Sequence, residues 1–231
     1  MSLDIAIRLT EICMGFAFVQ QSIEHLRIEK DERKIFIPRL LLATLLIVGF
    51  QTAAVSILLF VISLILLQRF QGPYNGGADR MGLLMLFCLV LTHVAPTAYW
   101  REVSFGYLAI QLVLSYFISG WVKVINAEWR SGRALSDVFL FSAYPVSESL
   151  RKWSQSPGML FLMSWSVIML ELLFPFALLS STTLTVALTL TAAFHLANAI
   201  LFGLNRFFWV WVAAYPSILW LQQRIFSHLS L

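Results

Sequence analysis

Charged residues are scarce in this sequence of 231 residues. Asp, Glu, Lys and Arg make up 12% of the chain, whereas soluble domains carry about 25%. The deficit runs along the whole length, which excludes a sizeable water-soluble domain. The formal net charge is +4, but the basic residues lie in short clusters between apolar runs. This pattern argues against nucleic acid as a partner and favours a membrane.

Cysteine is also rare, and its placement excludes a disulfide framework. Cys13 and Cys88 lie in separate apolar runs without a CxxC pair, so we expect both to be core residues. The sequence has no phosphate-binding loop, no serine nucleophile elbow and no paired carboxylates for hydrolysis. No cleavable signal peptide is expected, because Asp4, Arg8 and Glu11 interrupt the start of the chain.

Long apolar runs are abundant: 59% of residues are hydrophobic and the mean hydropathy is +0.81. Since a transmembrane helix needs about 20 mostly apolar residues, we predict an all-α polytopic membrane protein with about seven to eight transmembrane helices. No repeat or linker is visible, so a single domain over residues 1–231 is expected. The expected segments are Leu3–Gln21, two from Ile37–Leu67 divided at Gly49–Thr52, Ala78–Thr97, Val103–Lys123, Gly158–Leu179, Thr183–Phe202 and Phe207–Gln223.

The first segment differs from the others because it carries three charges. Asp4, Arg8 and Glu11 stand at i, i+4 and i+7, so they share a helix face and can neutralise each other. This segment either spans the bilayer or lies on its surface. The longest connection, Asn126–Pro157, is polar, and its aromatic residues suit the headgroup level; these are Trp129, Tyr144 and Trp153.

The distribution of Lys and Arg predicts the orientation. Twelve of the 16 lie in connections on one side of the predicted bundle, which the positive-inside rule places in the cytoplasm. Arg8, Arg101 and Arg224 lie on the other side. Lys123, the last of the 16 basic residues, is assigned to neither side. The twelve are Arg27, Lys30, Arg33, Lys34, Arg39, Arg69, Arg80, Arg130, Arg133, Arg151, Lys152 and Arg206.

Four ionisable residues lie within apolar segments, where a charge costs about 2.5–3.5 kcal/mol at the bilayer centre. Polar residues stand at four-residue intervals before Lys123: they are Ser119, Ser115 and Gln111. This spacing places them in a polar stripe on one face of a helix. The stripe is typical of helix packing with a lysine that reaches the headgroups. Alternatively, Lys123 is a partly desolvated base.

Glu171 stands four residues before Pro175, which lacks the N–H that would bond the carbonyl of residue 171. We expect a helix kink there. Glu171 either binds a cation, polar partner or ligand hydroxyl, or is a protonated residue paired with a neighbouring helix.

His195 and Asn198 share a helix face at i and i+3. No cysteine or carboxylate stands at ligand spacing, so no metal site is expected, and an interhelical hydrogen-bonded pair is the simpler reading. His93, three residues before Pro96, is expected to serve packing.

Several blocks resemble a known family. The first two are Tyr116-Phe-Ile-Ser-Gly-Trp-Val-Lys123 and Trp129-Arg-Ser-Gly-Arg-Ala-Leu135, and the third is Phe194-His-Leu-Ala-Asn-Ala-Ile-Leu-Phe202. They resemble vitamin K-dependent gamma-carboxylase and its bacterial relatives, the horizontally transferred transmembrane (HTTM) family. The turn Asn75–Asp79 is similar to bacterial members.

The resemblance implies a bundle of the carboxylase type in a bacterial inner membrane. It also implies chemistry on a reduced quinone, with Lys123 after Gly120 as the base and Glu171, His195 and Asn198 beside the quinol. The carboxylase carries a large extramembrane domain for its peptide substrate that this sequence does not show. A partner protein subunit is therefore expected beside the membrane lipids, and the alternative function is a non-catalytic scaffold or accessory subunit. A transporter with a cation site at Glu171 is a third hypothesis.

Overall fold

The computed structural model describes residues 1–28, 33–69, 76–141 and 148–229. The described chain forms two compact units, and each is treated by itself below. The first unit contains residues 1–110 and 206–231, and the second contains residues 111–205. The division falls within helix α5, Ala98–Ile125, after Ile110.

The described residues are helical in both units, which confirms the all-α prediction. The first unit contains α1 (Leu3–Ile28), α2 (Arg33–Val48), α3 (Thr52–Arg69), α4 (Gly76–Val94), the first part of α5 and α11 (Asn205–Leu229). The second contains the rest of α5, α6 (Ala127–Arg130), α7 (Arg133–Phe141), α8 (Glu148–Arg151), η1 (Lys152–Gln155), α9 (Pro157–Leu172), η2 (Phe174–Leu179) and α10 (Ser181–Phe202).

Three of the described helices are long and apolar enough to cross a membrane, so the predicted count of seven to eight is not confirmed. They are Gly77–Val94, Ala98–Ile125 and Ser181–Phe202. Two further apolar helices, Thr52–Gln68 and Pro157–Leu172, are shorter. The predicted segment Gly158–Leu179 is divided, because the α-helix ends at Leu172 and continues as the 3-10 helix η2 around Pro175.

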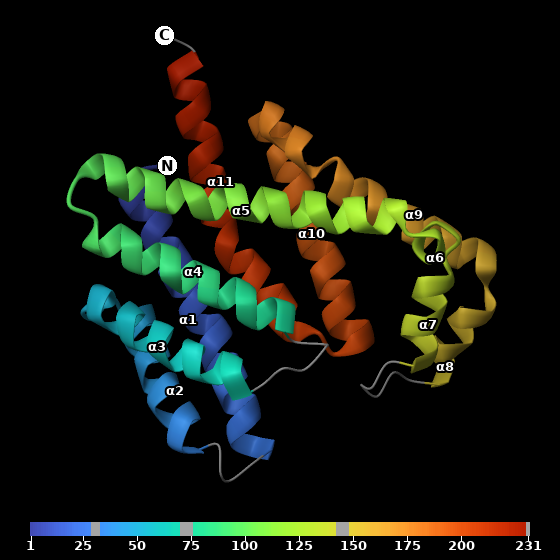
Figure 1. Cartoon of the computed structure of the whole chain (residues 1–231), viewed down its shortest axis with the longest axis horizontal. Helices are drawn as coiled ribbons and strands as arrows, with labels where there is room; N and C mark the ends of the chain where they lie inside the picture. Colours follow the sequence, from blue (N-terminus) through green and yellow to red (C-terminus); the bar gives the residue numbers. More distant parts are fainter. Residues whose placement is uncertain (29–32, 70–75, 142–147, 230–231) are drawn as a thin grey trace. The chain divides into compact units, whose positions relative to one another are not determined.

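In the first unit, α1 packs along α2, and α3 packs on α4 (Figure 1). The predicted break at Gly49–Thr52 is confirmed. The N–H of Phe50 donates to the carbonyl of Leu45, and that of Gly49 to Leu46, which is the Schellman arrangement at a helix end. Gly49 has φ of 87°, in the left-handed region that glycine adopts readily.

The charges of α1 are satisfied partly within α1 and partly by other helices. Arg8 donates to Glu11 at 2.9 Å, and also to the carbonyls of Leu46 and Ile47 at the end of α2. Glu11 is 2% exposed and its second oxygen lies 2.6 Å from Nε2 of His93. Asp4 accepts instead from Arg101, so the prediction that all three charges neutralise each other holds only for Arg8 and Glu11.

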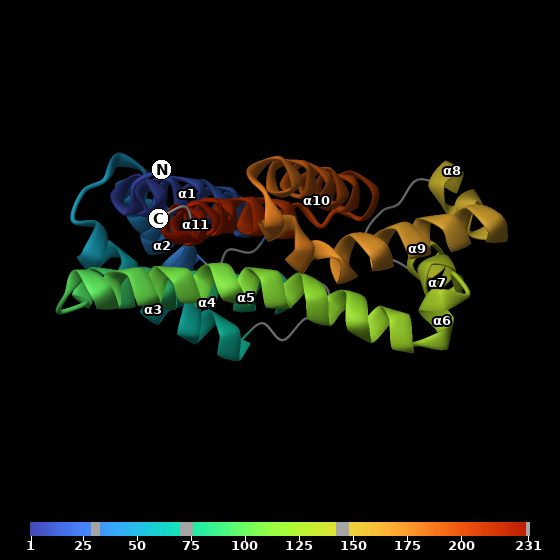
Figure 2. The same cartoon turned by 90° about the horizontal axis from the view of Figure 1, so that it is seen from above.

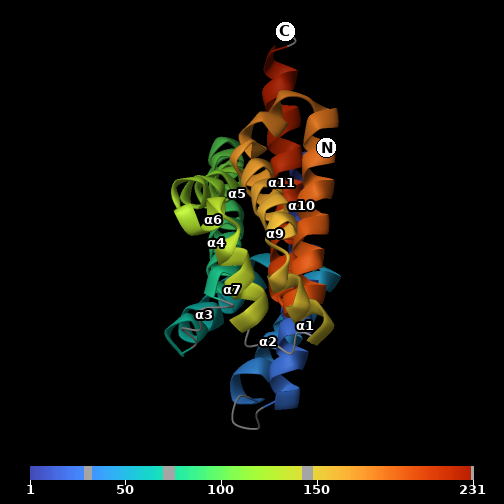
Figure 3. The same ribbon diagram turned by 90° about the vertical axis from the view of Figure 1, so that its right-hand side faces the viewer.

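In the second unit, the polar connection is partly helical. The short helices α6 and α7 pack against α9 (Figure 2), and η2 joins α9 to α10 (Figure 3). Phe139 of α7 is fully buried and packs on Phe202 of α10 and on Trp153, with ring centroids 5.0 and 5.9 Å apart. Tyr144 and the predicted turn residue Asn75 lie outside the described residues.

Candidate functional site

An ion pair between α5 and α9 is the centre of the candidate site in the second unit. The Nζ of Lys123 lies 2.5 Å from Oε2 of Glu171 and 2.6 Å from Oγ of Ser119. The side chain of Lys123 is 14% exposed and that of Glu171 is 6% exposed. Two predicted residues from distant parts of the sequence therefore meet, and both charges are largely withdrawn from solvent.

Gly120 explains how the two helices come close enough for this pair. A Cβ at position 120 would lie 2.5 Å from the backbone nitrogen of Leu172 and 2.9 Å from its Cα. Only glycine allows the backbones to approach in this way. Because Gly120 precedes Lys123 by three residues, its contact with the end of α9 sets Lys123 beside Glu171.

An aromatic ring borders the amine of Lys123. Its Nζ lies 5.2 Å from the centroid of the Trp129 ring, within the range of a cation–π contact. Trp129 is fixed through its backbone, because its carbonyl accepts from Oγ of the buried Ser164 at 2.5 Å. Trp129 was predicted as an interfacial aromatic residue, and its contact with Lys123 was not foreseen.

His195 lies in a second hydrogen-bonded group of this unit. Its Nε2 is 3.0 Å from the hydroxyl of Tyr116 on α5. The ring of Tyr116 in turn packs on Phe174, with centroids 4.2 Å apart. Tyr116 and Lys123 are seven residues apart, so they lie two turns apart on one face of α5. Tyr116 was missed as a site residue, although its i+7 spacing to Lys123 was a usable signal.

The structure does not join Asn198 to these groups. Its backbone carbonyl accepts from the N–H of Leu204 at the end of α10, and no hydrogen bond of its side chain occurs in the described part of the chain. The rest of the predicted polar stripe is also separate. The hydroxyl of Ser115 donates to the carbonyl of Leu112 in its own helix, so only Ser119 of the stripe reaches Lys123.

An apolar hollow adjoins α9, η2 and α10. It has a volume of about 540 Å³ and includes Leu170, Leu173 and Phe174, which flank Glu171 in sequence. Phe174 both lines the hollow and packs on Tyr116. The second unit thus combines an amine, a carboxyl, a phenol–imidazole pair and an apolar surface.

This set of groups suits proton transfer. A lysine and a glutamate in direct contact can exchange one proton through their hydrogen bond. Among the described residues, no three His, Cys, Asp or Glu side chains gather as ligands for a metal ion.

Comparison with known proteins identifies the family of the chain. No curated protein and no solved structure matches the chain. The HTTM domain family matches residues 92–222, a range that holds more than half of the chain and every predicted site residue. The match and the three membrane-length helices identify a membrane protein. The chain belongs to the HTTM domain family.

Proposed function

We propose that this protein carries out acid–base chemistry on a membrane quinol, with Lys123 as the base. The observation that supports the proposal is the 2.5 Å contact between Lys123 and Glu171 inside a membrane-family chain. When bound, a reduced quinone of the vitamin K type supplies an acidic hydroxyl. A lysine amine is a suitable acceptor for a hydroquinone proton.

The pair provides a route for the proton. In the ion-paired form, Nζ of Lys123 holds three protons and the carboxylate of Glu171 holds none. Movement of one proton from Nζ to Oε2 leaves a neutral amine and a neutral acid, so that the amine lone pair can accept a new proton. Ser119 keeps Nζ in position through its 2.6 Å contact. The cluster then holds one more proton than at the start.

The surrounding residues fit an amphipathic aromatic ligand. Tyr116 and His195 can donate to or accept from a ring oxygen, and the rings of Trp129 and Phe174 offer apolar faces. By family resemblance, His195, Asn198 and Glu171 orient the ligand, and Gly120 holds the backbone at the base. The same resemblance supports a location in a bacterial inner membrane, and we propose that a partner subunit there supplies the acceptor substrate.

A specific observation also favours the second candidate, a scaffold or accessory subunit. The close approach of Gly120 to Leu172 shows tight packing of α5 on α9, and an ion pair beside such a contact can simply fasten two helices. In this function Lys123 and Glu171 hold the fold together, and a partner protein performs the chemistry.

Quinol-dependent oxygen consumption by the purified, lipid-reconstituted protein distinguishes the quinol chemistry from the scaffold function. We expect turnover by the wild type and its loss in Lys123→Ala. Lys123→Arg should also be inactive, because arginine keeps the positive charge but does not act as a base near neutral pH. Lys34→Ala, which alters an exposed lysine of α2, should leave turnover unchanged.

The opposite pattern would favour the scaffold. If the wild type shows no turnover with several quinols, while Lys123→Arg keeps the thermal stability that Lys123→Ala loses, the pair fastens helices only. Identification of proteins that co-purify with the chain is then the next measurement.

A further inference from the structure

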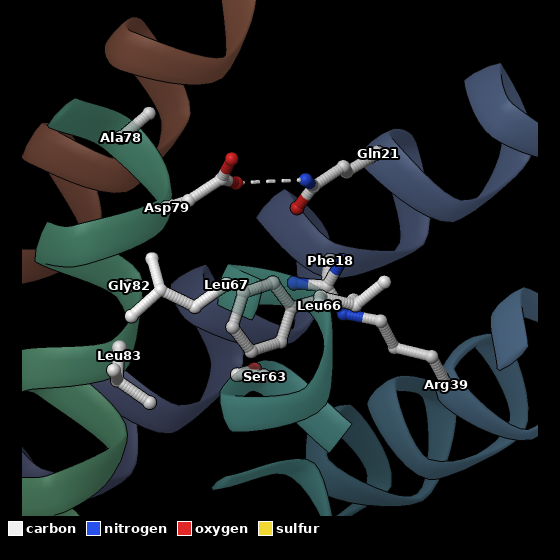
Figure 4. Close-up of a pocket in the computed structure, with 10 residues that line it drawn as sticks. All are labelled: Phe18, Gln21, Arg39, Ser63, Leu66, Leu67, Ala78, Asp79, Gly82 and Leu83. Atoms are coloured by element: carbon white, nitrogen blue, oxygen red, sulfur yellow. Dashed lines mark hydrogen bonds between the residues drawn. The ribbon is translucent and has the colours of Figure 1, made fainter. Parts of the chain in front are cut away.

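A small cavity lined by both polar and apolar residues lies within the first unit, among α1, α2, α3 and α4. Its volume is about 20 Å³. Figure 4 shows Arg39 of α2, Ser63 of α3 and Asp79 of α4 around it, with Gln21 of α1 beside Asp79. None of these residues belongs to the candidate site, and a cavity with four polar side chains from four helices requires an explanation.

Arg39 is the most unusual of the four. It is 3% exposed, and its guanidinium lies over the ring of Phe18 at 4.2 Å from the centroid. Within the described residues, its Nε and Nη1 have no hydrogen-bond acceptor. The guanidinium remains charged, and burial of its N–H groups without acceptors is strongly unfavourable. These donors therefore point to a ligand in the cavity.

Ser63 and Asp79 complete the polar lining. Ser63 is 8% exposed, and its Oγ also has no partner among the residues that the structure describes. One carboxylate oxygen of Asp79 accepts from Nε2 of Gln21 at 3.0 Å, the contact dashed in Figure 4. Asp79 and Arg39 form no direct ion pair within 4.0 Å. Space thus remains between opposite charges that line the same cavity.

We infer that the cavity binds a small hydrogen-bond acceptor, either a water molecule or a halide ion, that joins Arg39 to Ser63. The volume exceeds the roughly 10–15 Å³ that one water requires. Water and halide share the chemistry that Arg39 needs, because both accept from guanidinium and hydroxyl groups. Asp79 favours water, since its carboxylate repels a neighbouring anion.

The halide is tested by thermal unfolding in bromide and in gluconate at constant ionic strength. A bound halide raises the Tm with bromide concentration, by about 2–4 °C over the range in which the site fills. Arg39→Gln should abolish this rise. A Tm independent of bromide, together with the labelling described next, identifies water.

Water is tested by X-ray hydroxyl-radical footprinting of the wild type in lipid. Ordered water beside Phe18 should give oxidation of this ring well above that of Phe105, which is equally buried in the same unit but does not line the cavity. Ser63→Val removes a ligand group and fills space, so it should lower the Phe18 signal. Ser56→Val is the matched control, because Ser56 is a buried serine of α3 away from the cavity.

The wild-type measurements decide the inference even if a variant fails to fold. Either a bromide-dependent Tm or enhanced Phe18 oxidation supports the site and identifies its occupant. A Tm indifferent to bromide combined with Phe18 oxidation no greater than that of Phe105 would overturn it.

Discussion

At the scale of the residue, Lys123 and Glu171 depend on each other. Both side chains are mostly buried, with exposures of 14% and 6%, and they form an ion pair. Removal of one partner leaves the other as an uncompensated charge in low-dielectric surroundings. Replacement of both by apolar residues of similar size removes the charges together.

We therefore predict that Glu171→Leu alone destabilises the protein by about 3–5 kcal/mol. Lys123→Met with Glu171→Leu should recover most of that loss. Chemical unfolding in detergent measures both. Arg133→Met, which breaks the exposed pair with Glu128, is the control and should change stability little. A double variant as unstable as the single one would contradict the prediction.

The sequence predicted part of this site and could not predict the rest. Lys123 and Ser119 were paired correctly, because i and i+4 positions meet on any helix. Glu171 lies 48 residues from Lys123, and their contact depends on how α5 packs on α9. The contact of Tyr116 with His195 depends likewise on how α5 lies against α10. The contact of Trp129 with Lys123 depends on the turn from α5 into α6.

At the scale of the element, two glycines test the packing of α5 on α9. Gly120→Ala places a Cβ 2.5 Å from the nitrogen of Leu172, so the helices must separate. We predict a loss of about 1–3 kcal/mol, as overpacking usually gives. The matched control is Gly158→Ala, where no atom lies within 4 Å of the new Cβ. Thermal unfolding that ranks the two variants equally would refute this account.

The end of α2 provides a second test at this scale. Arg8 donates to the carbonyls of Leu46 and Ile47 in the last turn of α2, where helix carbonyls run out of donors from the next turn. The carbonyl of Leu46 also accepts from the N–H of Gly49. Arg8→Met should therefore deprive Ile47 of its side-chain donor, weaken the hydrogen bonding of Leu46 and loosen the turn. We predict faster hydrogen exchange at the amides of Gly49 and Phe50 than in the wild type, with α3 amides unchanged. Unaltered exchange at the turn would show that Arg8 is dispensable there.

Helix boundaries were predicted best where glycine or proline ends an apolar run. The break at Gly49–Thr52 was found because glycine adopts positive φ readily. Pro175 indicated a change in the helix after Glu171, but the α-helix ends at Leu172 rather than continuing with a kink to Leu179. The effect of the missing N–H was predictable, whereas the choice of a 3-10 continuation depends on local packing.

At the scale of the whole molecule, the orientation in the membrane is open to direct measurement. Helix α5 has 28 residues, which corresponds to about 42 Å at 1.5 Å per residue and is enough to cross a bilayer. Basic residues cluster after its C-terminal end. The positive-inside rule therefore predicts that this end lies in the cytoplasm and that the start of α5 lies outside.

We predict that Tyr99→Cys is labelled by a membrane-impermeant maleimide in intact cells, whereas Glu128→Cys is labelled only after lysis. Both positions are exposed, and Cys13 and Cys88 are replaced by alanine in both proteins to remove background. The reverse pattern would invert the topology, and labelling of both in intact cells would show that α5 does not span.

The link between Arg8 and the end of α2 has a consequence for biosynthesis. Arg8 is synthesised early, and its acceptors at Leu46 and Ile47 emerge from the ribosome 38 and 39 residues later. The end of α2 therefore gains these hydrogen bonds only if α1 stays beside the emerging α2. We expect the pairing of α1 with α2 to form during synthesis, as soon as the turn after α2 has emerged.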